Sequence, residues 1–179
     1  MTIKKRYVMK KSLLILFLLF AAGMAANAQK FALIDMEYIL KNIPAYERAN
    51  ELLDKSSKVW QSEVEKISEE AKKMYKDYQA QIATLSEEQR GKREEAIVAK
   101  EKSASELRRQ YFGPEGELYK KREGLMRPIQ NEIYNAVKEI STQKGYSMVV
   151  DRASATSIIF ASPSIDISNE VLAKLGYSN

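Results

Sequence analysis

Apolar residues recur every three or four positions along most of this chain. Over residues 44–85 the average step is about 3.5 residues, which predicts one amphipathic helix with a continuous apolar seam. At about 1.5 Å per residue, this helix would be roughly 60 Å long. A second segment of similar period, residues 86–144, runs on from it. The pattern therefore predicts a long antiparallel helical hairpin, or arm, whose reach is suited to holding, spanning or enclosing something.

Local signals define the ends of the arm. Pro44 suits the first position of a helix, and Gly145 suits the position just after a helix end. Ser86 and Gln89 have the spacing of a capping box, which places the hairpin tip near residues 84–86. The arm is therefore expected to occupy residues 44–144.

Gly113, Pro114 and Gly116 interrupt the second half of the arm. Two glycines and a proline within four residues do not favour a helix interior. We therefore expect a kink or local unwinding there, which would act as a joint in the arm.

The segments flanking the arm predict a small body, made of residues 29–43 and 145–179. Apolar runs predict three short strands, and cap signals predict two short helices, the second capped by Asp166 or Ser168. The strands are expected at residues 30–35, 146–151 and 157–161, and the helices at residues 36–41 and 169–175. Three short strands are too few to be stable alone and leave open edges, so we expect a homo-oligomer that completes the sheet or barrel.

Residues 1–28 have the pattern of a secretory signal peptide. Basic residues precede the apolar run at residues 13–22, and Ala26, Asn27 and Ala28 form an A-x-A cleavage site. The alternative is a membrane anchor, but the apolar run is short. Removing this segment removes five basic residues and leaves 24 basic and 24 acidic ones, so net charge gives no support for nucleic-acid binding.

Composition argues against an enzyme. The chain has no histidine and no cysteine, which removes the commonest general bases, nucleophiles and zinc ligands. It has no phosphate-binding glycine loop, and its carboxylate pairs are adjacent, so they do not share a helix face. We expect no catalytic residue, no metal site and no cofactor. The lack of cysteine also suits an oxidising compartment.

The order strand, long hairpin, strand, strand, helix resembles the Skp/OmpH family of periplasmic chaperones. The resemblance covers nearly all of the chain after the signal peptide, and its C-terminal part is the more specific. It is carried by the sequences FALID (31–35), NIPAY (42–46), LMRPIQ (125–130), AVKEI (136–140), KGYSMVVD (144–151) and DIS (166–168).

The resemblance implies a trimer in which strands from three copies build a small β-barrel body. Three helical tentacles would enclose unfolded outer-membrane proteins in the periplasm, without using ATP. The fold class expected is thus α+β, mostly α. The arms here carry nearly equal numbers of basic and acidic residues, unlike the basic arms of the best-known family members. Attraction to acidic cargo or to lipopolysaccharide therefore does not carry over from the family.

Three groups of residues are candidates for binding. Large apolar side chains off the seam are expected to contact cargo, unless they pack in the hairpin or at the arm's base; they are Leu52, Val59, Tyr75, Phe112, Tyr119 and Tyr134. Strand residues are expected to make the trimer contacts, namely Phe31, Leu33, Val149, Ile158 and Phe160. Near the tip, Arg90, Lys92 and Arg93 suit a weak contact with anionic lipid headgroups or acidic cargo, or else form a solvated helix start among neighbouring glutamates.

Two functions remain open at this point. The first is a periplasmic holdase, a chaperone that keeps unfolded outer-membrane proteins from aggregating through many weak contacts. The second is a structural spacer or adaptor of the cell envelope that docks one folded partner through the hairpin tip. A holdase should bind many unfolded clients and ignore folded ones, whereas a spacer should do the reverse.

Overall fold

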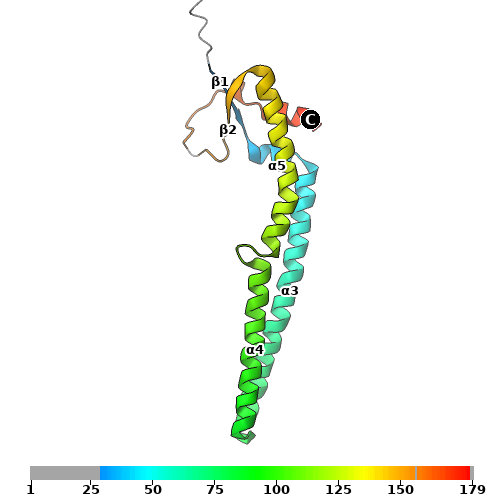
Figure 1. The fold of residues 1–179 in the computed structure, drawn as a ribbon, viewed down its shortest axis with the longest axis vertical. Helices are drawn as coiled ribbons and strands as arrows, with labels where there is room; N and C mark the ends of the chain where they lie inside the picture. Colours follow the sequence, from blue (N-terminus) through cyan, green and yellow to red (C-terminus); the bar gives the residue numbers. More distant parts are fainter. Residues whose placement is uncertain (1–28, 156, 178–179) are drawn as a thin grey trace, which may run out of the picture.

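A long two-layered arm extends from a small body (Figure 1). The computed structural model describes residues 29–155 and 157–177, so the predicted signal peptide lies outside the described residues. Helix α3 (Pro44–Gln81) forms one side of the arm, and helices α4 (Glu87–Phe112) and α5 (Glu117–Lys144) follow one another along the other side. The body lies at the α5 end of the arm; it holds strands β1 (Lys30–Ile34) and β2 (Tyr146–Asp151) and helices α2 (Met36–Lys41) and α6 (Ser168–Lys174).

Helix α3 (Pro44–Gln81) and helix α4 (Glu87–Phe112) meet at the hairpin tip. Pro44 is at the start of α3, where its missing N–H leaves no bond unmade. A short 3-10 turn, η1 (Ile82–Thr84), follows α3. Ser86 then caps α4, with both bonds of the capping box present to Gln89. The predicted tip and its cap are therefore confirmed.

The return side is broken between α4 and helix α5 (Glu117–Lys144), as the glycines and proline predict. The linking residues bulge outward on the side away from α3 (Figure 1). Helix α5 continues through Pro128 and ends at Gly145, whose φ of 71° is in the left-handed region that glycine favours. Gly145 is thus the predicted C-terminal cap.

The seam of the arm is narrow, and most of its buried side chains are small or medium in size. On α3 and α4, seven residues are buried along it, at intervals that match the helical period; they are Ala49, Leu53, Val64, Ala71, Tyr78, Ile97 and Ala104. Helix α4 contributes only two of them. A thin seam holds the hairpin together while leaving most of each helix facing solvent.

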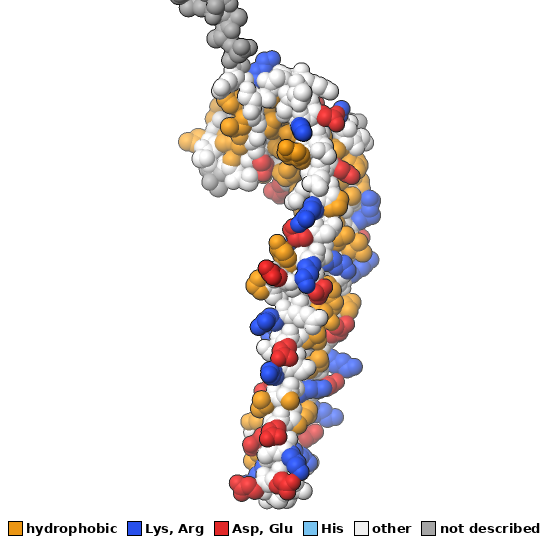
Figure 2. Space-filling model, in the orientation of Figure 1, with side chains coloured by type: hydrophobic (Ala, Val, Ile, Leu, Met, Phe, Trp, Pro, Cys, Tyr) orange, Lys and Arg blue, Asp and Glu red, His pale blue; other side chains and the backbone are white. Residues whose placement is uncertain are grey.

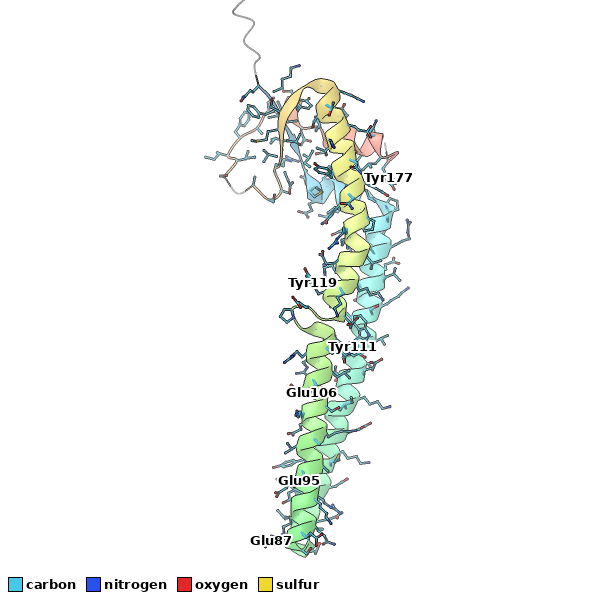
Figure 3. The ribbon with its side chains drawn as sticks, viewed as in Figure 1. Glu87, Glu95, Glu106, Tyr111, Tyr119 and Tyr177 are labelled. Atoms are coloured by element: carbon cyan, nitrogen blue, oxygen red, sulfur yellow. The ribbon has the colours of Figure 1, made fainter. Side chains whose placement is uncertain are left out.

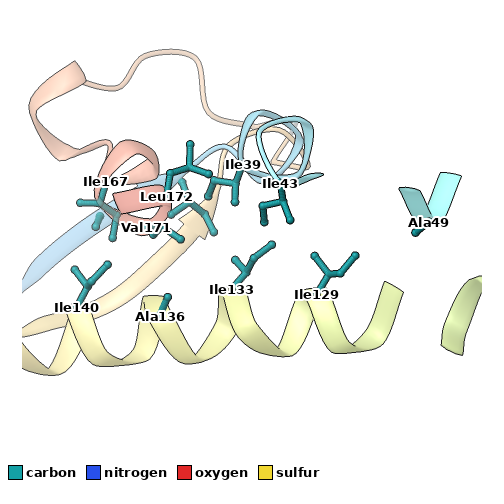
Figure 4. Packing of buried hydrophobic residues seen from close by; sticks show 12 residues of the cluster. Ile39, Ile43, Ala49, Ile129, Ile133, Ala136, Ile140, Ile167, Val171 and Leu172 are labelled. Atoms are coloured by element: carbon teal, nitrogen blue, oxygen red, sulfur yellow. The ribbon is translucent and has the colours of Figure 1, made fainter. Parts of the chain in front are cut away.

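The body has a core built against the last turns of the arm (Figure 4). Helix α5 points Ile129, Ile133 and Ile140 at residues of helix α2 (Met36–Lys41) and helix α6 (Ser168–Lys174), such as Ile39 and Val171. Ile39, Ile133 and Val171 are the largest fully buried side chains. Since α5 belongs to both parts, the arm is packed directly into the body.

The sheet of the body is two-stranded and parallel. Strand β1 (Lys30–Ile34) pairs with strand β2 (Tyr146–Asp151), with Phe31 opposite Met148 and Ala32 opposite Val149. The far edge of β1 is partly taken by the chain before α6: Leu33 bridges to Asp166, and Ile167 N–H donates to Leu33 O at 2.9 Å. The predicted strand at residues 157–161 is wrong, because the described residues of this segment have no strand structure and no ladder partner.

Carboxylates from other elements complete the helix ends in the body. Asp35 accepts from Tyr38 N at 2.8 Å, and Asp151 of β2 accepts from Met36 N at 3.0 Å. Burial alone would raise the pKa of Asp151. The hydrogen bonds that its carboxylate accepts from Met36, Ala153 and Ser154 outweigh burial, so the pKa is lowered. The predicted cap of α6 is different: its N-cap is Ile167, although Asp166 accepts from Ser168 N at 2.9 Å and so serves the first turn.

Candidate functional site

All six predicted cargo residues are exposed large apolar or aromatic side chains. Their exposed fractions run from 38% for Phe112 to 65% for Tyr134, with Leu52, Val59, Tyr75 and Tyr119 between. They lie off the buried seam, so the hairpin core does not use them. Figure 2 shows hydrophobic side chains interspersed with charged ones down the visible face of the arm. Their position meets the requirement for a cargo role, which stays a prediction.

Two further exposed apolar residues lie in the distal half of the arm. Ile82 is 40% exposed, because α3 ends at Gln81 and the chain turns away there. Val98 is 60% exposed and follows the buried Ile97. Adjacent helix residues point in different directions, so Ile97 and Val98 cannot both face the seam. The exposure of Val98 could therefore have been predicted from the sequence.

An aromatic pair braces the arm next to the break. Trp60 of α3 stacks on Tyr111, near the end of α4, with ring centroids 5.0 Å apart and planes 11° from parallel. The Tyr111 hydroxyl donates to Glu63 Oε2 at 2.5 Å. This bond, with burial and the negative charge of Glu63, raises the pKa of the Tyr111 hydroxyl. Figure 3 shows Tyr111 on the α3 side of the break.

A second contact reaches Trp60 from beyond the break. Lys121 Nζ of α5 lies 5.7 Å from the Trp60 ring centroid and 2.6 Å from Ser56 Oγ. Trp60 thus touches one residue before the break and one after it. We call Trp60, Tyr111 and Lys121 the brace; it holds both sides of the break against α3.

The glycines at the break allow close backbone approach rather than an unusual φ angle. A Cβ on Gly116 would lie 2.7 Å from Tyr111 O and 2.8 Å from Gln110 O, and one on Gly113 would lie 2.4 Å from Arg109 O. Both glycines have φ near −70°, which any residue adopts. The break is therefore a defined, closely packed loop, closed by the Gly116 N–H bond to Gly113 O at 2.9 Å.

Two grooves with different linings lie between α3 and α4 in the distal half. The first, the tyrosine groove, has a volume of about 440 Å³; Tyr75, Ile82, Val98, Glu94 and Glu101 contribute to its lining. The second, the basic groove, has a volume of about 290 Å³ and contains Met74, Asp77, Lys92 and Arg93. Ile97 of the seam lines both grooves.

The basic residues near the tip do not form one patch. Lys92 pairs with Glu88 at 2.6 Å, and Lys92 and Arg93 line the basic groove. Arg90 is half-buried, with its Nε left without a hydrogen-bond partner in the described part of the chain. Contact of Arg90, Lys92 and Arg93 with lipid headgroups or acidic cargo stays a prediction.

The body also exposes apolar surface. Phe31 and Met148, opposite one another in the sheet, are 47% and 55% exposed, and Ile159 and Phe160 are 102% and 84% exposed. These four residues are the body patch, and Figure 2 shows hydrophobic side chains gathered on the body. The other predicted trimer contacts differ from Phe31 and Phe160. Leu33 is buried in its own chain, Val149 packs on the core, and Ile158 is half-buried. A trimer contact through these residues stays a prediction.

None of the helices in residues 29–155 and 157–177 combines the length and apolar character that crossing a membrane requires. No group of three or more metal-ligating side chains occurs within the same residues. What the described chain does offer is a long arm with exposed apolar side chains and a body with an exposed apolar patch. These features are those expected of a protein that binds other chains over extended surfaces.

The comparisons with known proteins name the family. The model of the family "Outer membrane protein (OmpH-like)" matches residues 30–175, and the chain belongs to this family. Two curated relatives are each called "Chaperone protein Skp". The one from Yersinia enterocolitica is 25% identical over 155 residues, covering 87% of this chain and 91% of that protein. The one from Pectobacterium atrosepticum is 23% identical, covering 87% and 90%.

A solved structure shares the fold. It is a candidate outer membrane chaperone (OmpH-like) from Caulobacter crescentus, with a TM-score of 0.66 and 12% identity, and the match covers 84% of this chain and 86% of that one. The predicted membership of the Skp/OmpH family is therefore confirmed. Its members are chaperones rather than enzymes, and this chain is not an enzyme.

Proposed function

We propose that this protein is an ATP-independent holdase of the periplasm. It binds unfolded outer-membrane proteins and keeps them from aggregating during transit. The relatives named as Skp chaperones support the general role. The observation that carries the proposal is the set of large apolar side chains that the hairpin leaves exposed along its whole length. Such side chains make weak, non-directional contacts, which suit many different unfolded clients.

The body patch supports assembly into a homo-oligomer, which we take to be a trimer. The two-stranded sheet is too small to be stable without further packing, and Phe160 and Ile159 are almost fully exposed in the single chain. Self-association would cover this surface. Three arms brought together at their bodies would then enclose a space in which clients are kept apart from one another.

The break between α4 and α5 gives such a cage a place to bend. Below it, α3 and α4 form one closed hairpin, and above it α5 is fixed in the body core. The brace sets the resting shape of the arm. Replacing residues 113–116 with a helix-forming sequence is expected to stiffen the arm; an unchanged distribution of tip-to-tip distances in the oligomer would count against a joint there.

The test of the proposal removes arm contacts without touching the seam. A variant with Tyr75, Phe112 and Tyr119 replaced by Ser should bind an unfolded outer-membrane barrel protein more weakly and suppress its aggregation less. A matched variant with the exposed polar residues Gln61 and Lys102 replaced by Ser should behave like the wild type. Circular dichroism would show that both variants are folded.

Equal client affinity for the aromatic variant and the wild type would overturn the role of the arm surface. The same experiment addresses the spacer alternative. A spacer would leave the unfolded barrel protein unprotected and would bind one folded envelope partner through the tip.

A further inference from the structure

In the tyrosine groove, exposed large apolar side chains from both sides of the distal arm meet. Tyr75 and Ile82 come from the α3 side, and Val98 comes from α4. All three are at least 40% exposed and line the same opening of about 440 Å³. This volume is in the range of sites that enclose a small ligand or a few side chains.

The rim of this groove is acidic. Glu94 and Glu101 line it, together with the neutral Tyr78 and Gln79, and no basic residue does. Glu94 accepts a hydrogen bond from the Tyr78 hydroxyl, and Glu101 has no ion-pair partner among the described residues. Arg90, one helical turn before Glu94, adds an opposing charge toward the tip but is outside the lining.

The charge of the rim contrasts with that of the basic groove on the same hairpin. There Lys92 and Arg93 outnumber Asp77. In this part of the hairpin, charges of opposite sign therefore lie in different grooves. An unfolded chain that meets the arm encounters apolar surface with carboxylates at one groove and with cations at the other.

We infer that the tyrosine groove binds extended, unfolded segments in which an apolar side chain is flanked by Lys or Arg. The apolar side chain would enter between Tyr75 and Val98, and the flanking cations would reach Glu94 and Glu101. These two carboxylates are seven residues apart on α4, or about 10 Å along its axis. Residues three apart in an extended chain are separated by about the same distance, at roughly 3.3 Å per residue. Their side chains leave opposite sides of the chain, and the long flexible stems of Lys or Arg let both cations turn toward the rim.

The inference rests on the proposed function and adds a preference among clients to it. Segments of outer-membrane barrels alternate apolar and polar residues, so many of them present apolar side chains beside charged ones. The groove would select among such segments by the sign of the flanking charge. It would favour basic segments, whereas a basic arm would favour acidic ones.

The test uses two unstructured peptides with a common Gly/Ser frame. One contains the sequence Lys-Phe-Val-Lys and the other contains Glu-Phe-Val-Glu at the same place. Calorimetric titration into the full mature protein at low salt should give at least about fivefold tighter binding of the basic peptide. The difference should shrink as the salt concentration rises, because the rim is solvent-exposed.

Two variants assign the preference to the groove. The variant E94Q/E101Q keeps the shape of the rim and should bind both peptides about equally. The variant K92Q/R93Q changes the basic groove on the same hairpin and should keep the preference for the basic peptide. Thermal unfolding followed by circular dichroism would check that each variant is folded.

The outcomes separate this inference from the proposed function. Equal binding of the two peptides by the wild type, binding of neither, or a preference that survives in E94Q/E101Q would overturn the inference. If the protein still protects an unfolded barrel protein in those cases, the holdase proposal stands without the groove preference. If the protein protects no barrel protein either, the proposed function fails as well.

Discussion

The substitution Gly116→Ala tests the view that the break is a closely packed loop. The added Cβ would lie under 3.0 Å from three backbone atoms, Tyr111 O, Gln110 O and Gly113 N. Backbone cannot rotate away as a side chain does, so the loop must shift. Overpacking of this kind costs about 1–3 kcal/mol.

Two other effects modify this cost. Ala restricts the unfolded chain more than Gly does, which returns about 0.4–1 kcal/mol at a φ that Ala accepts. A shift of the loop would also weaken the Gly116 N–H bond to Gly113 O, which is worth about 0.5–1.5 kcal/mol. The expected result is a destabilisation of the arm by about 1–2 kcal/mol.

The matched control is Gly124→Ala in the interior of α5. A Cβ there would have nothing within 4 Å, so Ala should stabilise the helix by about 0.5–1 kcal/mol. Urea unfolding can be followed by the fluorescence of Trp60, which is the only tryptophan of the chain and stacks on Tyr111 beside the break. The two variants should therefore move the unfolding midpoint in opposite directions. A Gly116→Ala protein as stable as the wild type, or more stable, would refute the close packing of the break.

Three further predictions concern the body. Ile133→Ala should destabilise the fold by about 2–5 kcal/mol in thermal unfolding, because Ile133 is fully buried between α5 and the body; a loss no larger than that of Tyr134→Ala would contradict this. Asp151 has a lowered folded pKa, so its stabilising effect is present above the unfolded value of about 3.9 and is lost as pH falls through the folded value. When the free energy of unfolding is measured at pH 6 and at pH 3, Asp151→Asn should lose less stability between the two pH values than the wild type does. Equal losses in the two proteins would contradict this role of Asp151. Phe160→Asp should lower the native mass measured by light scattering, and an unchanged mass would exclude the body patch as the contact between copies.

The helices were predictable because their signals are local. The period of the apolar residues predicted α3 and α5. The cap at Ser86 predicted the start of α4, and the cap at Gly145 predicted the end of α5. The break was predictable because two glycines and a proline fall within four residues, whereas Pro128 alone is accommodated inside α5. None of these features depends on a residue far away in the chain.

The absence of the third predicted strand could not be read from the sequence, because a strand forms only where an edge is available for pairing. Residues 157–161 have the apolar composition of a strand, yet β1 pairs with β2 on one edge and meets the chain at Asp166 on the other. Composition alone cannot show that the outer edge of β1 is already met by Asp166, or that residues 157–161 do not add to the sheet beside β2.

Of the candidate binding surface, the sequence predicted the exposed side chains of single helices but not the contacts between helices. Exposure of Tyr75 and Tyr134 followed from their distance from the seam. The brace did not, since it joins Trp60 to residues 51 and 61 positions later, and nothing in the period of the apolar residues aligns the two sides of the hairpin. The same holds for the tyrosine groove, which needs the pairing of α3 with α4.

The most direct test is the mass in solution of residues 29–179, the chain without the predicted signal peptide. Size-exclusion chromatography with light scattering would be run with and without an outer-membrane barrel protein diluted from urea. The account predicts a trimer that gains the mass of one client and keeps that client soluble. A protein that stays without client while the barrel protein aggregates would contradict the holdase function and favour the spacer.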